Sequence, residues 1–101
     1  MRQYELYLVI DAESEEEDVN AIVERMTELV TAGDGETSGE VIKVVPRGRR
    51  RLAYPIRKKT ESQDVILFLQ TPSQALREME RVLKLDERVL RYLIVRRDEK
   101  K

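Results

Sequence analysis

The order in which two hydrophobic periods alternate along this 101-residue chain limits the folds that it can adopt. A period of two, typical of half-buried strands, occurs over residues 4–10, 40–45, 49–56, 64–70 and 88–97. The ranges 40–45 and 49–56 count as one strand, which Pro46 and Gly48 interrupt, as expected of an edge strand or a bulge. A helical period follows the first strand and precedes the last. The resulting order, β-α-β-β-α-β, predicts a ferredoxin-like α+β sandwich, with a four-stranded antiparallel sheet and both helices on one face.

The two helical segments carry their own start and stop signals. Ser14 and Glu17 form a capping-box pattern, so the first helix is predicted over residues 15–31, and Gly33 is expected to end it. Residues 71–73, Thr-Pro-Ser, are expected to start the second helix. The apolar stripe of this second helix consists of Leu76, Met79, Val82 and Leu83.

Length and composition bound the class of protein. We expect one domain over residues 1–97 and a short charged tail over residues 98–101. The sequence has no Cys and no His, which excludes disulfides and thiol nucleophiles and removes the usual general base. No apolar run approaches the ~20 residues that span a bilayer, and we expect no cleavable signal before the first strand. We therefore expect a cytoplasmic protein with no membrane segment, cofactor or metal.

Charge is divided unequally along the chain. Residues 11–40 contain eleven carboxylates and one Arg, a net charge of −10, whereas residues 41–101 contain seventeen Lys and Arg and eight carboxylates, a net charge of +9. Residues 47–59 alone carry seven positive charges and no negative one. A protein built in this way attracts a polyanion on one side and repels it on the other.

The positive residues are mostly Arg, whose planar guanidinium pairs with phosphate through two hydrogen bonds. Five further arginines lie on the first and last strands, which are neighbours in the predicted fold: Arg2, Arg88, Arg91, Arg96 and Arg97. We expect these five to converge on one side of the sheet. The third strand supplies Phe68 as its one aromatic residue, so phosphate contacts are favoured over base stacking.

The predicted strands are apolar on both faces. Helices cover one face of such a sheet, and the other face should then be polar. In the first strand, Tyr7 and Val9 alternate with the apolar residues Leu6, Leu8 and Ile10. Phe68 and Leu93 likewise alternate with apolar residues in the third and last strands. An apolar patch of this kind is typical of an interface, so we expect a protein partner on the open face.

Three segments resemble one known family. Residues 48–56, Gly-Arg-Arg-Arg-Leu-Ala-Tyr-Pro-Ile, resemble the signature of bacterial small-subunit ribosomal protein six. Residues 2–5 open the chain as that family does, and residues 86–96 resemble its final strand. The resemblance implies a ferredoxin-like fold without enzymatic activity. It also implies binding to the central domain of small-subunit ribosomal RNA as a heterodimer with ribosomal protein eighteen.

The resemblance and the charge pattern together give two sets of candidate residues. Matching positions imply that Arg2, Arg91 and Arg96 contact RNA phosphates. The full predicted RNA-binding set is Arg2, Arg49, Arg50, Arg51, Lys58, Arg88, Arg91 and Arg96. Residues 49–51 are left open between RNA and the protein partner. The predicted partner-binding set is Tyr7, Val9, Tyr54, Ile66, Phe68 and Leu93.

Two other classes compete with this interpretation. Small phosphatases of this fold use an Arg near the first loop, but this chain has no Arg between Gln3 and Arg25. The carboxylates at residues 15–18 are better explained as partners of a helix dipole than as a metal site. A regulatory or protein-interaction domain that acts through its open sheet face remains as the alternative. Such a domain would be a stable homodimer, whereas we expect the isolated chain to be a monomer.

Overall fold

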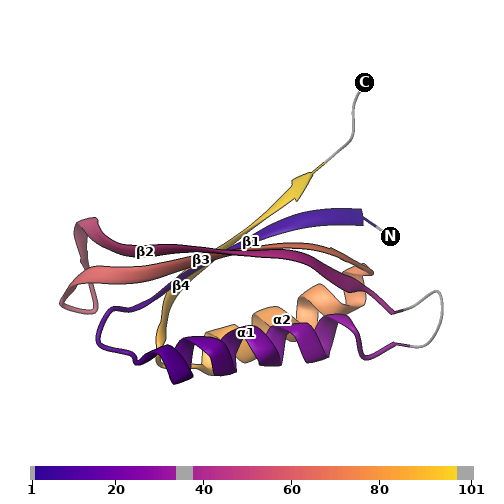
Figure 1. The fold of residues 1–101 in the computed structure, drawn as a ribbon, viewed down its shortest axis with the longest axis horizontal. Coiled ribbons are helices and arrows are strands. Elements are labelled where there is room, and N and C mark those ends of the chain that lie inside the picture. Colours follow the sequence, from indigo (N-terminus) through magenta and orange to yellow (C-terminus); the bar gives the residue numbers. More distant parts are fainter. Residues whose placement is uncertain (1, 34–37, 98–101) are drawn as a thin grey trace.

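Four strands pair in the order β2-β3-β1-β4 in the computed structural model, which describes residues 2–33 and 38–97. The elements are β1 (Arg2–Asp11), α1 (Glu16–Val30), β2 (Glu40–Ile56), β3 (Lys59–Thr71), α2 (Ser73–Leu85) and β4 (Val89–Arg97). All three strand pairs are antiparallel. Both helices lie on the same side of the sheet (Figure 1). The predicted ferredoxin-like α+β sandwich is therefore confirmed.

The core fills the space between the sheet and the two helices. The even-numbered residues of β1 from Tyr4 to Ile10 are buried there, and they are paired with residues of β3 that are buried or half-buried. The buried residues that join them are Ile22, Met26, Val30, Val65, Leu67, Leu69, Met79, Leu83 and Val89. The odd-numbered residues of β1 consequently lie on the open face of the sheet. The helices thus cover the face that carries the even-numbered residues of β1.

The first helix begins and ends one residue inside its predicted range. Its first turn is capped by a different pair than expected, because the carboxylate of Asp18 accepts a hydrogen bond from the backbone N–H of Glu15 at 3.0 Å. The predicted pair, Ser14 and Glu17, lies one residue earlier. At the other end α1 stops at Val30, whose carbonyl accepts a hydrogen bond from the backbone of Gly39 at 2.8 Å. Gly33 therefore lies beyond the end of the helix.

The second strand is longer than its sequence pattern predicted. Pro46 and Gly48 do not end it, since β2 continues to Ile56. Its pairing with β3 shifts register between Pro46 and Gly48, and Gly48 has a φ of 78°. A positive φ of this kind is typical of a glycine in a β-bulge. The bulge confirms the expectation of an irregular edge strand at this point.

Residues 34–37, between the predicted first helix and the second strand, and the predicted charged tail at 98–101 lie outside the described residues. Within the described ranges, no helix is long and apolar enough to cross a bilayer.

Candidate nucleic-acid interface

The seven cations of residues 47–59, which we call the basic hairpin, follow the distal half of β2, the turn and the first residue of β3. Ile56 pairs with Lys59, so Arg57 and Lys58 alone form the connection. Both have positive φ, 51° and 67°, which is the geometry of a two-residue type I′ turn. Lys58 therefore lies at the exposed tip of a tight hairpin.

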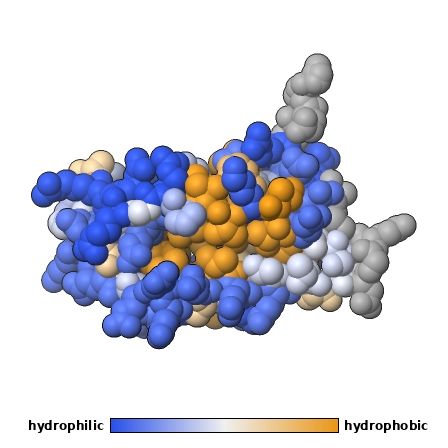
Figure 2. Space-filling view, in the orientation of Figure 1, coloured by the Kyte–Doolittle hydropathy of each residue, from blue (hydrophilic) through white to orange (hydrophobic). Residues whose placement is uncertain are grey.

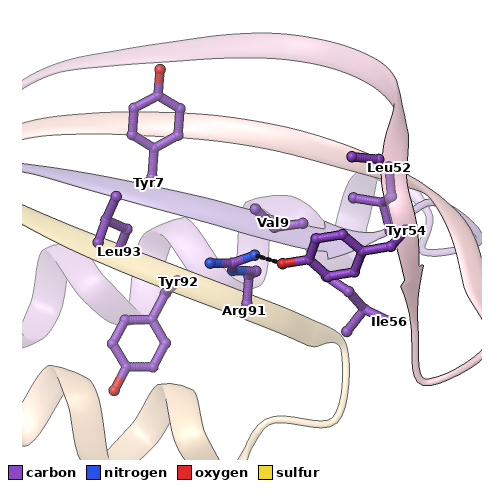
Figure 3. A pocket seen from close by; sticks show the side chains of 9 residues that line it. Tyr7, Val9, Leu52, Tyr54, Ile56, Arg91, Tyr92 and Leu93 are labelled. Atoms are coloured by element: carbon purple, nitrogen blue, oxygen red, sulfur yellow. Dashed lines mark hydrogen bonds between the residues drawn. The ribbon is translucent and has the colours of Figure 1, made fainter.

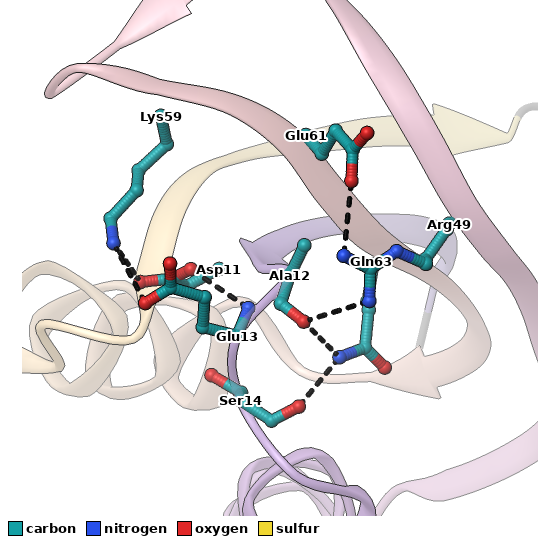
Figure 4. Close-up of polar contacts among 8 residues, drawn as sticks. All are labelled: Asp11, Ala12, Glu13, Ser14, Arg49, Lys59, Glu61 and Gln63. Carbon is teal, nitrogen blue, oxygen red and sulfur yellow. Dashed lines mark hydrogen bonds and ion pairs between the residues drawn. The ribbon is translucent and has the colours of Figure 1, made fainter.

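Three cations of the basic hairpin are balanced by carboxylates. Arg49 lies 3.0 Å from Glu61 and also donates to the carbonyl of Ala12 at 3.3 Å (Figure 4). The guanidinium of Arg50 lies 3.8 Å from the carboxylate of Asp64. Lys59 lies 3.3 Å from both Asp11 and Glu13. Because these carboxylates offset three of the seven cations, the local positive charge is smaller than the sequence alone suggests.

The contacts of Lys59 shift two pKa values in opposite directions. Hydrogen bonds to Glu13 and Asp11 raise the pKa of Lys59. The pKa of Asp11 is lowered first by the hydrogen bond from the Glu13 backbone, with Lys59 adding to the effect and burial opposing it. Both groups are therefore fully ionised at neutral pH.

Four cations of the basic hairpin, Arg47, Arg51, Arg57 and Lys58, make no ion pair with a carboxylate among the described residues. Arg47 instead donates to the hydroxyl of Tyr7 at 3.3 Å. Arg57 donates to two backbone carbonyls at the start of β4. These four residues keep their charge uncompensated, which is the property that phosphate binding requires.

The open face carries an apolar concavity of about 270 Å³ beside the basic hairpin. Its lining comes from three strands and consists of Tyr7, Val9, Leu52, Ala53, Tyr54, Ile56, Arg91, Tyr92 and Leu93. Figure 3 shows Tyr54 and Arg91 pointing toward one another, and Nη1 of Arg91 donates to the Tyr54 hydroxyl at 2.9 Å. The Arg91 side chain has no carboxylate contact in the described part of the chain. An apolar floor thus lies next to uncompensated positive charge.

Comparison with known proteins decides the family. The model of the family "Ribosomal protein S6" matches residues 3–96 of the chain. Small ribosomal subunit protein bS6 of Moorella thermoacetica is 42% identical over 100 residues, which cover 98% of this chain and 97% of that protein. The chain belongs to the ribosomal protein S6 family. The corresponding protein of Caldanaerobacter subterraneus is 37% identical over 99 residues, covering 98% of this chain and all of the relative.

A solved member of the S6 family has the same fold. The crystal structure of 30S ribosomal protein S6 from Thermotoga maritima superposes with a TM-score of 0.81 at 27% identity, over 95% of this chain and 87% of that one. As an S6 family member, the chain is a structural protein of the small ribosomal subunit, in the cytoplasm, and is not an enzyme. The family resemblance of residues 48–56 is thereby confirmed.

The expected convergence of five arginines on one side of the sheet is wrong. Arg91 pairs with Val9 and Arg97 with Gln3, which places both on the open face. Arg96 pairs with Tyr4, whose side chain is buried beneath the helices, and Arg2 shares the parity of Tyr4 on β1. Alternation along the strands therefore sends Arg2 and Arg96 to the helix side. The sequence put these arginines on neighbouring strands correctly, but the expectation overlooked the odd spacing of Arg96 from Arg91 and Arg97, so that alternation sends Arg96 to the opposite face.

Arg88, the fifth of these arginines, lies just before β4 and is held by acidic residues. Its guanidinium donates to Asp86 at 2.8 Å and to Asp18 of α1 at 3.3 Å. The hydrogen bonds to Asp86 also lower the pKa of that carboxyl. Arg88 therefore joins β4 to the acidic helix, and its charge is balanced.

Four of the six predicted partner-binding residues line the concavity: Tyr7, Val9, Tyr54 and Leu93. The side chains of Tyr54 and Leu93 are 59% and 56% exposed. Ile66 is only 5% exposed, so it offers little surface to a partner. Phe68 is half-buried, with the guanidinium of Arg97 5.7 Å from its ring centroid. The predicted set is thus centred on the concavity, with Ile66 directly opposite Tyr7 on β3 and Phe68 farther along the sheet.

Sequence reasoning missed a second apolar concavity, of about 360 Å³, between α1 and β2. Figure 2 shows apolar side chains gathered in the middle of this view, and Val19, Val23, Val44 and Val65 line the hollow. Val44 is 41% exposed. The rim includes Glu16 and Asp64, so the surface is unsuited to RNA. The apolar alternation of residues 40–45 was its signal in the sequence.

Proposed function

We propose that the chain binds the central domain of small-subunit ribosomal RNA as a heterodimer with ribosomal protein eighteen. Membership of the S6 family supports a place in the small subunit. The single observation that carries RNA binding is the set of cations that no carboxylate balances within the described residues, at the hairpin and beside the open-face concavity: Arg47, Arg51, Lys58 and Arg91. Phosphate groups take the place of the missing carboxylates.

The proposed RNA contacts form two groups at opposite ends of the sheet. Residues 49–51, Lys58 and Arg91 lie at the hairpin end, whereas Arg2 and Arg96 lie where β1 begins and β4 ends. At the rise of a strand, Arg2 lies roughly 30 Å along the sheet from the level of Arg50, and Arg96 lies roughly 17 Å from Arg91 on the same strand. Two separated contacts fix the orientation of the protein on RNA better than one. Because Arg88 is held by two carboxylates, we expect the smallest contribution from it.

The protein partner is proposed to cover the open face, with Tyr7, Val9, Tyr54 and Leu93 at the centre of contact. Exposed aromatic and aliphatic side chains around a concavity are the usual anchors of protein interfaces. The acidic α1 repels RNA and the net charge of the chain is −1. We therefore expect the isolated chain to bind RNA weakly and to need its partner first.

The test measures binding of a fluorescent central-domain RNA fragment to the chain alone, to the partner alone and to their mixture. We expect tight binding by the mixture and weak binding by each protein alone. Submicromolar binding of the isolated chain would contradict the requirement for a partner. Absence of binding by the mixture, although a heterodimer is seen by size-exclusion chromatography, would contradict RNA binding itself.

A further inference from the structure

The two outermost strands of the sheet meet at one end of the molecule. β2 and β4 occupy opposite edges, with β3 and β1 between them. Nevertheless, Leu52 and Tyr54 of β2 line the same concavity as Arg91 and Leu93 of β4. The pairing of β2 with β3 shifts register between Arg51 and Ile56. The distal part of the hairpin therefore curls across the open face, because a flat sheet would hold the two edges apart.

Arg57 connects the curled hairpin to the opposite edge. Its Nη1 donates to the carbonyl of Glu87 and its Nη2 donates to the carbonyl of Val89, both at 3.1 Å. The planar fork of a guanidinium can reach two acceptors at once, which an ammonium group cannot do with the same geometry. Val89 is the first residue of β4, so these bonds fix the turn against the start of that strand.

The turn itself adopts a costly conformation. Arg57 and Lys58 both have positive φ, a region that residues other than glycine enter at a cost of roughly 1 kcal/mol each. Neighbouring contacts must offset this cost for the conformation to persist. Arg57 has two such contacts, whereas Lys58 makes none among the described residues. The two turn residues thus have different surroundings despite their equal charge.

We infer that Arg57 is a positioning residue, whose two hydrogen bonds to the Glu87 and Val89 carbonyls hold the hairpin across the sheet and so form the open-face concavity. Its guanidinium therefore serves the shape of the concavity, and Lys58 is the turn residue whose charge is available to a phosphate. The role assigned to the concavity in binding rests on the proposed function, but the positioning role does not.

A matched pair of substitutions separates shape from charge. Arg57→Lys keeps the charge and removes the fork, whereas Lys58→Gln removes a charge and leaves the fork intact. The first measurement uses the isolated chain and records nuclear Overhauser effects between the Tyr54 ring and the Arg91 side chain. We expect Arg57→Lys to weaken these signals at least twofold and Lys58→Gln to leave them unchanged. Signals of wild-type intensity in Arg57→Lys would overturn the inference.

The same spectra show whether Arg57→Lys is folded. Nuclear Overhauser effects between β1 and β3 persist only if the sheet is intact, so their presence excludes global unfolding. Should that variant not fold, Arg57→Gln provides the same readout, and disappearance of the Tyr54 signals with an intact β1–β3 pairing is again the expected result. The second measurement is affinity for ribosomal protein eighteen. We expect a roughly tenfold decrease for Arg57→Lys and less than a twofold change for Lys58→Gln.

The two measurements test separate claims, so one claim can be contradicted while the other is supported. Weaker Tyr54 signals with unchanged partner affinity would support the positioning role and contradict the proposed partner surface. Preserved signals with reduced affinity would overturn the positioning role and make Arg57 a direct contact of the partner.

Discussion

Arg88 lies 3.3 Å from Asp18, so an arginine from the basic half of the sequence is bound to the acidic helix α1. It also contacts Asp86 at 2.8 Å. Segregation of charge along the chain is therefore only partly kept in space. Contacts of this kind contribute to the fold, whereas uncompensated arginines such as Arg91 are available to a nucleic acid.

Substitution of Arg88 should therefore affect stability more than RNA binding. We expect Arg88→Gln to lower the free energy of unfolding by about 1 kcal/mol, because the variant cannot form the two partly exposed ion pairs. Arg91→Gln should leave stability nearly unchanged and weaken RNA binding by the heterodimer. Urea unfolding and RNA titration of the two variants provide the comparison. A larger decrease of RNA affinity in Arg88→Gln would show that its charge is used at the interface.

Asp86 should make the fold sensitive to acid. Hydrogen bonds from Arg88 lower its pKa in the folded state. The stability that Asp86 contributes is therefore present above its unfolded pKa, near 3.9, and is lost as the pH falls through the folded value. Between pH 6 and pH 3, we expect the free energy of unfolding of Asp86→Asn to fall by about 0.5 kcal/mol less than that of the wild type. Urea titrations at the two pH values measure this difference. If the free energy of unfolding fell equally in the wild type and in Asp86→Asn, this role would be contradicted.

The turn residue Lys58 offers a test in which stability and binding move in opposite directions. With a φ of 67°, this position favours glycine, so Lys58→Gly should raise the free energy of unfolding by about 1 kcal/mol. The same change removes a cation and should weaken RNA binding by the heterodimer. A variant that is both more stable and unchanged in RNA affinity would remove Lys58 from the proposed contacts.

These residues also show how far the sequence could predict the molecule. Alternation and helical periods were sufficient for the order of elements, because burial dictates it. Since the strands are apolar on both faces, the same patterns left open which face the helices cover. The position of Gly48 signalled the bulge. Alternation alone places Arg96 on the face opposite to Arg91, which is five residues away, so the sequence already contained this part of the answer. The register adds which residues of β1 lie beside them. The contact of Arg57 with β4 depends on curvature across all four strands, so it was not predictable either.

The choice between the two apolar surfaces can be made with one pair of variants. Leu93 lies in the open-face concavity and Val44 in the concavity between α1 and β2, and both are exposed. We expect Leu93→Asp to weaken binding of ribosomal protein eighteen by roughly tenfold or more, and Val44→Asp to have less than a twofold effect. The reverse result, measured by isothermal titration calorimetry, would move the partner to the α1–β2 surface.

The salt dependence of RNA binding tests the central claim, that uncompensated cations of the hairpin contact phosphates, most directly. The affinity of the heterodimer for a central-domain RNA fragment should fall steeply as salt rises. In the double variant Arg51→Gln with Lys58→Gln, the slope of log affinity against log salt should be smaller by about 2, because each phosphate that a cation neutralises adds about one to the slope. A slope equal to that of the wild type, or an affinity that stays constant from low to physiological salt, would contradict the account.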